Sequence, residues 1–93
     1  MPLATHTVQL EDERVIVNRF DFEPGDDTGH HVHGHPYVIV PLTDGRLRIE
    51  DDTQGEIFAD LAAGVPYSRP AGVSHNVFNA GDTALSFLEI EIK

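Results

Sequence analysis

The chain has 93 residues, with 16 acidic and 6 basic side chains, a formal net charge of −10 and no cysteine. This length supports a single domain over residues 1–93. The acidity excludes nucleic acid and anionic lipid as partners, and the lack of thiols excludes disulfides and thiolate metal ligands. Neither a signal peptide nor an apolar run of about 20 residues is found, so we expect a cytoplasmic protein with no membrane partner.

Short runs of β-branched and aromatic residues, separated by turn signals, extend along the chain. They predict strands at residues 6–10, 14–22, 28–35, 37–42, 46–50, 56–61, 65–69, 74–79 and 84–92. Pro24-Gly25 and Pro70-Ala71-Gly72 predict tight turns, and Asp44-Gly45 predicts a hairpin between the strands on either side of it. No window shows a capped helical apolar period, so we expect an all-β barrel or sandwich with little or no helix.

Two patterns concern the packing of these strands. In the last strand, Leu88, Ile90 and Ile92 fall on one face and Phe87, Glu89 and Glu91 on the other. Three phenylalanines, Phe20, Phe22 and Phe78, are expected in the core rather than at a substrate platform.

Four of the six histidines lie close together, at positions 30, 31, 33 and 35. On an extended strand His31, His33 and His35 leave from one face. A titratable row of this kind would be unusual in an apolar core, but it suits a cavity in which at least two rings bind a metal ion. His75, which we expect on a strand across the barrel, is the distant partner. Nitrogen ligands of this type suit one divalent transition metal, Fe, Ni, Zn, Mn or Cu.

Two spaced motifs connect these histidines to a known family. Gly25-x5-His31-x-His33 followed by Gly45, and Gly64-x5-Pro70-x-Gly72-x2-His75-x3-Asn79, resemble the two motifs of the cupin superfamily. The resemblance implies a double-stranded β-helix, that is, a jelly-roll barrel, with His31, His33 and His75 as metal ligands. The glutamate that usually follows the first-motif histidines is absent here, because Tyr37 and Val38 stand in its place.

For several side chains the sequence is compatible with two different roles. His35 and Tyr37 are each a candidate fourth ligand, although His35 also suits the rim of a cavity. Arg69 shares a face with Tyr67, and it either points into the cavity to bind a carboxylate or is a solvated strand arginine. His30 is expected at the surface or at an interface. We further expect Asn79 in a turn and the carboxylates at 11–13 and 50–52 in solvated loops.

The function that we expect is a metal-dependent enzyme acting on a small organic metabolite, through dioxygenase-type chemistry or Lewis-acid isomerase, decarboxylase or lyase chemistry. The sequence does not identify a catalytic residue. The alternatives are a barrel that only binds a small ligand and a structural barrel that dimerises. The resemblance also implies a homodimer with the apolar terminal strands in contact, and similar single-domain cupins are in some cases named for β-alanine degradation.

Overall fold

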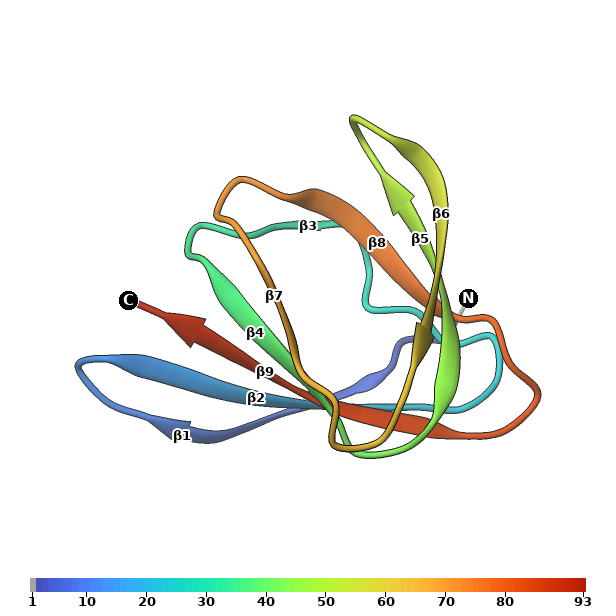
Figure 1. Ribbon diagram of the computed structural model, residues 1–93, viewed down its shortest axis with the longest axis horizontal. Coiled ribbons are helices and arrows are strands. Elements are labelled where there is room, and N and C mark those ends of the chain that lie inside the picture. The colour runs from blue at the N-terminus through green and yellow to red at the C-terminus, as the bar shows by residue number, and fades with distance from the viewer. Residues whose placement is uncertain (1) are drawn as a thin grey trace.

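Two antiparallel sheets face each other in the computed structural model, which describes residues 2–93 (Figure 1). The larger sheet contains, in spatial order, β1 (Thr5–Glu11), β2 (Val15–Phe22), β9 (Leu85–Ile92), β4 (Tyr37–Pro41) and β7 (Tyr67–Arg69). The smaller sheet contains, in spatial order, β3 (His31–Val32), β8 (Ser74–Asn79), β5 (Gly45–Asp51) and β6 (Gly55–Leu61). The chain crosses between the sheets repeatedly, so residues distant in sequence become neighbours.

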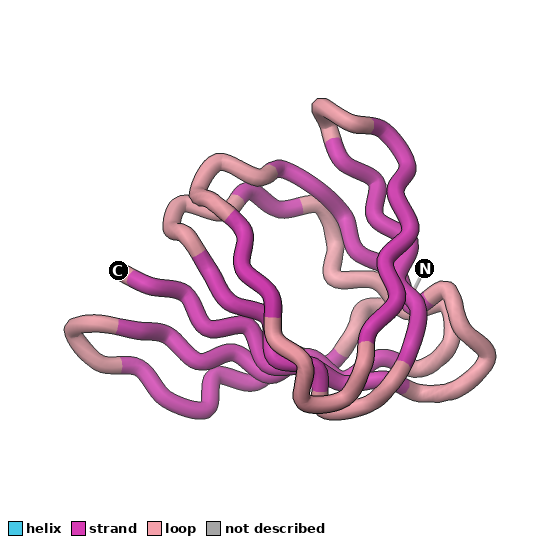
Figure 2. Tube along the Cα trace, viewed as in Figure 1, coloured by secondary structure: helices cyan, strands magenta, loops and turns pink. Residues whose placement is uncertain are grey.

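Strands and connecting loops account for the whole of residues 2–93, and no helix occurs among them (Figure 2). The predicted all-β fold class is therefore confirmed. No helix in this part of the chain could span a membrane.

The core lies between the two sheets and follows from strand alternation. Along β4, Tyr37, Ile39 and Pro41 are buried, and the residues between them are only half-buried. The other core side chains are Phe22, Leu47, Ile49, Leu61, Val77, Leu85 and Phe87. Phe20 packs against this cluster, with its ring centroid 5.6 Å from that of Phe87. Phe78 is buried apart from the cluster, beneath the Arg48 guanidinium at 4.0 Å.

The Asp44-Gly45 dipeptide does not close a hairpin, so that prediction was wrong. β4 and β5 lie in different sheets, and the chain turns a corner of the barrel between them. Gly45 is needed there for space: a Cβ atom on it would lie 2.9 Å from Leu85 Cδ2. The hairpin in this region instead joins β5 to β6, whose ladder ends at the Asp51–Gly55 pair. Gly55 has the positive φ that this tight connection requires.

The predicted strand at 28–35 is much shorter than expected, because β3 contains only His31 and Val32. Gly29 has a positive φ, and Pro36 lacks the N–H that a ladder uses. These two residues interrupt regular pairing on either side. The Pro24-Gly25 and Pro70-Ala71-Gly72 turns are present, with positive φ at Gly25 and Gly72.

Replacing Gly45 by alanine is expected to lower the free energy of unfolding by about 1–3 kcal/mol, because the added methyl overpacks the corner. Leu85, which it would meet, is only 1% exposed and has little room to move. Urea denaturation followed by circular dichroism measures the change. The matched control is Gly34→Ala, whose Cβ would meet nothing within 4 Å. Equal stability of the two variants would contradict this account of Gly45.

Candidate metal centre

Three histidines converge because a short strand pairs with its neighbour. His31 on β3 stands directly opposite His75 on β8, and such partners project from the same face of a sheet. His33 follows β3, where its N–H donates to the Val73 carbonyl at 2.8 Å and its own carbonyl accepts from the Gly72 N–H at 2.8 Å. The turn at Pro70–Gly72 thus holds the His33 backbone in place. His75 comes from the adjacent strand and not, as predicted, from across the barrel.

The Nε2 atoms of the three rings meet at one point. His33 Nε2 lies 3.0 Å from His31 Nε2 and 3.1 Å from His75 Nε2. Two nitrogens each ~2.1 Å from a common ion are about 3.0 Å apart if the bonds meet at a right angle. The donor type and the spacing therefore fit a transition-metal ion, and these three side chains form a group that could hold one.

The protonation of these rings also suits metal binding. His31 Nδ1 lies 2.8 Å from the Gly29 carbonyl, which can only accept, so the proton sits on Nδ1 and the lone pair on Nε2. Burial, followed by the nearby His31 and His75, lowers the pKa of His33 to about 3. Burial, followed by His31, likewise lowers the pKa of His75 to about 4. These two rings are neutral at pH 7, with nitrogen lone pairs available.

Two glutamates that the sequence did not single out lie behind His33. Glu89 and Glu91 on β9 have carboxylate oxygens 3.9 Å and 4.0 Å from His33 Nδ1, the ring atom that faces away from the histidine cluster. Burial, followed by the charge of Glu91, raises the pKa of Glu89 to about 8. Carboxyl groups in this position commonly orient a metal-binding imidazole. The sequence did contain a signal for their position: in the alternating pattern of residues 84–92, Glu89 and Glu91 share a strand face with Phe87, which is buried.

The two candidate fourth ligands take different positions. His35 is half-buried and does not belong to the group of converging ligand atoms among the residues described. The Tyr37 ring stacks on the His33 ring, with centroids 3.8 Å apart and planes at 20°. Burial raises the pKa of the Tyr37 phenol above its usual value, so its hydroxyl keeps its proton. Tyr37 thus packs against His33 and presents a hydrogen-bond donor.

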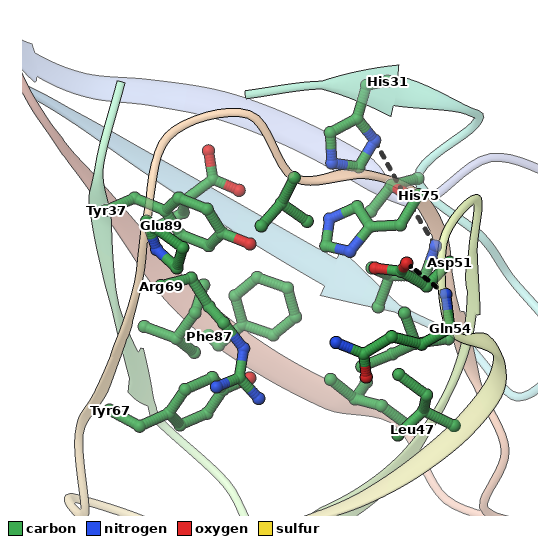
Figure 3. Close-up of a pocket in the computed structure, with 17 residues that line it drawn as sticks. His31, Tyr37, Leu47, Asp51, Gln54, Tyr67, Arg69, His75, Phe87 and Glu89 are labelled. Carbon is green, nitrogen blue, oxygen red and sulfur yellow. Dashed lines mark hydrogen bonds between the residues drawn. The ribbon is translucent and has the colours of Figure 1, made fainter. Parts of the chain in front are cut away.

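A cavity of about 300 Å³ opens beside the histidines (Figure 3). His31 and His75 contribute to its wall, and apolar side chains of Ile39, Leu47, Ile49, Ile57, Val77 and Phe87 form much of the remainder. Its polar side chains come from Thr28, Tyr37, Asp51, Gln54, Tyr67, Arg69 and Glu89. Asp51 was expected in a solvated loop, but it ends β5 and faces this cavity, with one carboxylate oxygen accepting from the Thr53 and Gln54 N–H groups.

Outside the cavity, His30, Asp52 and Ser74 form an exposed cluster, in agreement with the expected surface position of His30. His30 Nε2 lies 3.0 Å from an Asp52 oxygen and 3.2 Å from Ser74 Oγ. A catalytic triad uses both ring nitrogens, whereas here both partners contact the same one. The cluster is therefore not a nucleophilic triad. Asn79 was expected in a turn, but it is the last residue of β8, paired with Leu47. Its side chain spans the turn that follows, donating to Thr83 O and accepting from the Gly81 N–H.

The barrel, its paired motifs and its histidine cluster define a class of protein. The family model for the cupin domain matches residues 18–91, and the chain belongs to this family. The predicted membership is thus confirmed.

Individual proteins of known name or structure also resemble this chain in sequence or in fold. The β-alanine degradation protein BauB of Pseudomonas aeruginosa is 51% identical over 92 residues, covering 99% of this chain and 96% of that protein. A crystal structure of a cupin domain from Bordetella pertussis Tohama I is 49% identical, with a TM-score of 0.94 over 99% of this chain and 95% of that one. An RmlC-like cupin with a double-stranded β-helix fold from Methanocaldococcus jannaschii is 14% identical, with a TM-score of 0.81 over 99% and 82% of the two chains, which supports the fold alone.

The metal-free protein is expected to be most stable near pH 6.5. The depressed pKa values of His33 and His75 mean that the unfolded chain binds more protons below pH 6.5, so stability falls as the pH drops. Glu89 acts oppositely: its pKa rises from 4.5 to about 8, so its contribution is lost as the pH rises through that window. Two histidines outweigh one carboxyl between pH 4.5 and 6.5, giving a net loss on the order of 1 kcal/mol per pH unit.

Chemical denaturation in the presence of a chelator, repeated across this pH range, measures the profile. Glu89→Gln is the matched variant, and it should abolish the decline above pH 6.5 while retaining the decline below it. A flat profile between pH 4.5 and 6.5 would show that the histidines are not desolvated as described.

Proposed function

We propose that this protein is a metal-dependent cupin enzyme acting on a small organic metabolite, with His31, His33 and His75 as the metal ligands. The supporting observation is the convergence of three Nε2 atoms, with separations of 3.0 and 3.1 Å, beside a cavity of about 300 Å³. Three protein ligands leave coordination positions for substrate or water, as in catalytic sites and unlike closed structural ones.

The metal would be one divalent transition ion, Fe, Ni, Zn, Mn or Cu. When bound, a redox-active ion supplies dioxygen chemistry and a redox-inert ion polarises a carbonyl. The protein's own groups have separate roles. Glu89 and Glu91 orient the His33 ring from its Nδ1 side. The protonated Tyr37 hydroxyl donates a hydrogen bond toward a bound molecule, and the apolar wall limits the water around it.

The likeness to BauB supports a role in the degradation of β-alanine or of a related small metabolite. Such a role suits a cytoplasmic enzyme with a small-molecule substrate and with neither nucleic acid nor membrane as partner. We also propose a homodimer, for which the exposed apolar side chains Val8 and Leu10 on β1 and Ile92 on β9 are candidate contacts.

Metal content tests the ligand assignment. Protein purified without chelator is expected to carry about one transition-metal ion per chain, and His31→Ala, His33→Ala and His75→Ala should each weaken binding by at least ~10-fold, since each removes a ligand atom. Inductively coupled plasma mass spectrometry measures the content. His35→Ala is the matched control, because His35 lies outside the converging group, and it should retain the metal. Unchanged content in all three ligand variants would overturn the proposal.

Turnover distinguishes the two types of chemistry. With iron loaded, oxygen uptake in the presence of a panel of small organic acids is expected if the reaction is a dioxygenation, and it should be lost in His75→Ala. If the chemistry is Lewis-acid catalysis, zinc-loaded protein should convert a substrate without consuming oxygen, as followed by NMR. Tight binding of a panel member with no turnover under either metal would favour a barrel that only binds its ligand.

A further inference from the structure

An arginine lies at the cavity, away from the histidines. Arg69 on β7 stands directly opposite Tyr37 on β4, so the two side chains project from the same face of the sheet. Both line the cavity, and the Arg69 guanidinium carbon lies 5.1 Å from the centroid of the Tyr67 ring (Figure 3). Stacking on this ring leaves the edge of the guanidinium, which carries the N–H donors, available for another group.

No carboxylate neutralises this arginine within the part of the chain that the structure describes. Four of the six basic side chains, Arg19, Arg46, Arg48 and Lys93, pair with an acidic side chain, whereas neither Arg69 nor Arg14 has an acidic oxygen within 4.0 Å of a side-chain nitrogen among residues 2–93. Of these two unpaired arginines, only Arg69 lines the cavity.

We propose that Arg69 binds the carboxylate of the substrate, which is therefore a small carboxylic acid. This inference rests on the proposed function and adds the chemical class of the molecule that the site accepts. Arg69 is solvent-exposed while it lines the cavity, so its side chain is accessible to an entering acid. The planar guanidinium presents paired N–H donors that match the two oxygens of a carboxylate.

The shape of the cavity specifies the rest of the molecule. About 300 Å³ lies at the small end of ligand sites, so a short chain fits better than a long one. Ile39, Leu47 and Phe87 offer apolar contacts to methylene groups between the two ends. The end opposite the carboxylate reaches His31 and His75, where the proposed metal would act. Asp51, paired in register with His75, disfavours a second carboxylate there. A short monocarboxylate with a reactive group at its far end satisfies these constraints.

Binding of a minimal probe tests this assignment. Zinc-loaded protein is titrated by calorimetry with propanoate and with propanamide, which has nearly the same shape but no charge. We expect propanoate to bind about 10- to 100-fold more tightly than propanamide, the range typical of a charge-assisted pair. Arg69→Gln should remove this preference at unchanged zinc content. Arg69→Lys keeps the positive charge but loses the paired N–H donors of the guanidinium, so its preference for propanoate should lie between those of the wild type and Arg69→Gln.

The control is Arg46→Gln, which removes the same charge from the pair with Asp60 on the outer surface and should bind propanoate like the wild type. The failure of the two proposals can be distinguished. Equal propanoate affinity for Arg69→Gln and wild type, with zinc bound in both, would overturn the role of Arg69 and leave the metal site intact. Arg69-dependent binding of propanoate by a protein that takes up no zinc would support this role and overturn the proposed function.

Discussion

The antiparallel pairing of β3 with β8 is the contact on which the site depends. It sets His31 opposite His75. Beyond the strand, the His33 N–H donates to the Val73 carbonyl and the His33 carbonyl accepts from the Gly72 N–H, which extends the pairing by two backbone hydrogen bonds. Backbone hydrogen bonds define both direction and spacing, so imidazoles from the two motifs reach one point without support from any helix. The Pro70–Gly72 turn is part of the same arrangement, because it provides the backbone groups that hold His33.

This arrangement has an electrostatic cost that burial makes larger. Three Nε2 atoms lie close together, and burial, followed by the neighbouring imidazoles, lowers the pKa of His33 and of His75, so positive charge on these rings is disfavoured. A cation at the shared point would offset this electrostatic cost. On the opposite side of His33, carboxyl oxygens of Glu89 and Glu91 lie 3.9 Å and 4.0 Å from Nδ1, a position from which carboxyl groups commonly orient a metal-binding imidazole.

The cavity has a polar end at His31 and His75, a largely apolar wall, and the positively charged side chain of Arg69. Such a division suits a small amphiphilic molecule, held at one end and exposed to chemistry at the other. The glutamate missing from the first motif is relevant here. Tyr37 stands near its place in the sequence, with its ring packed on that of His33, and acidic side chains on β9 lie on the other side of the His33 ring. The site therefore combines three nitrogen donors with carboxyl groups that do not belong to the converging cluster.

Local patterns in the sequence were sufficient for the all-β fold class, for the family and for the choice of the three converging histidines. Alternation, turn residues and motif spacing are short-range properties that do not depend on which strands pair. The same reasoning failed at Asp44-Gly45, where the dipeptide suits a hairpin but the chain passes to the other sheet. Choosing a strand's partner is a long-range matter, decided by which apolar faces bury each other.

Only the tertiary structure placed Glu89 and Glu91 behind His33 and showed Arg69 at the cavity without an acidic partner. From sequence, Glu89 was one of several acids on a strand and Arg69 was equally compatible with solvent. Their roles depend on neighbours that are distant in the chain, since the charge state and pairing of a side chain are determined by what surrounds it in space. The identity of the candidate ligands was thus readable from the sequence, whereas the electrostatic environment around them was decided by the fold.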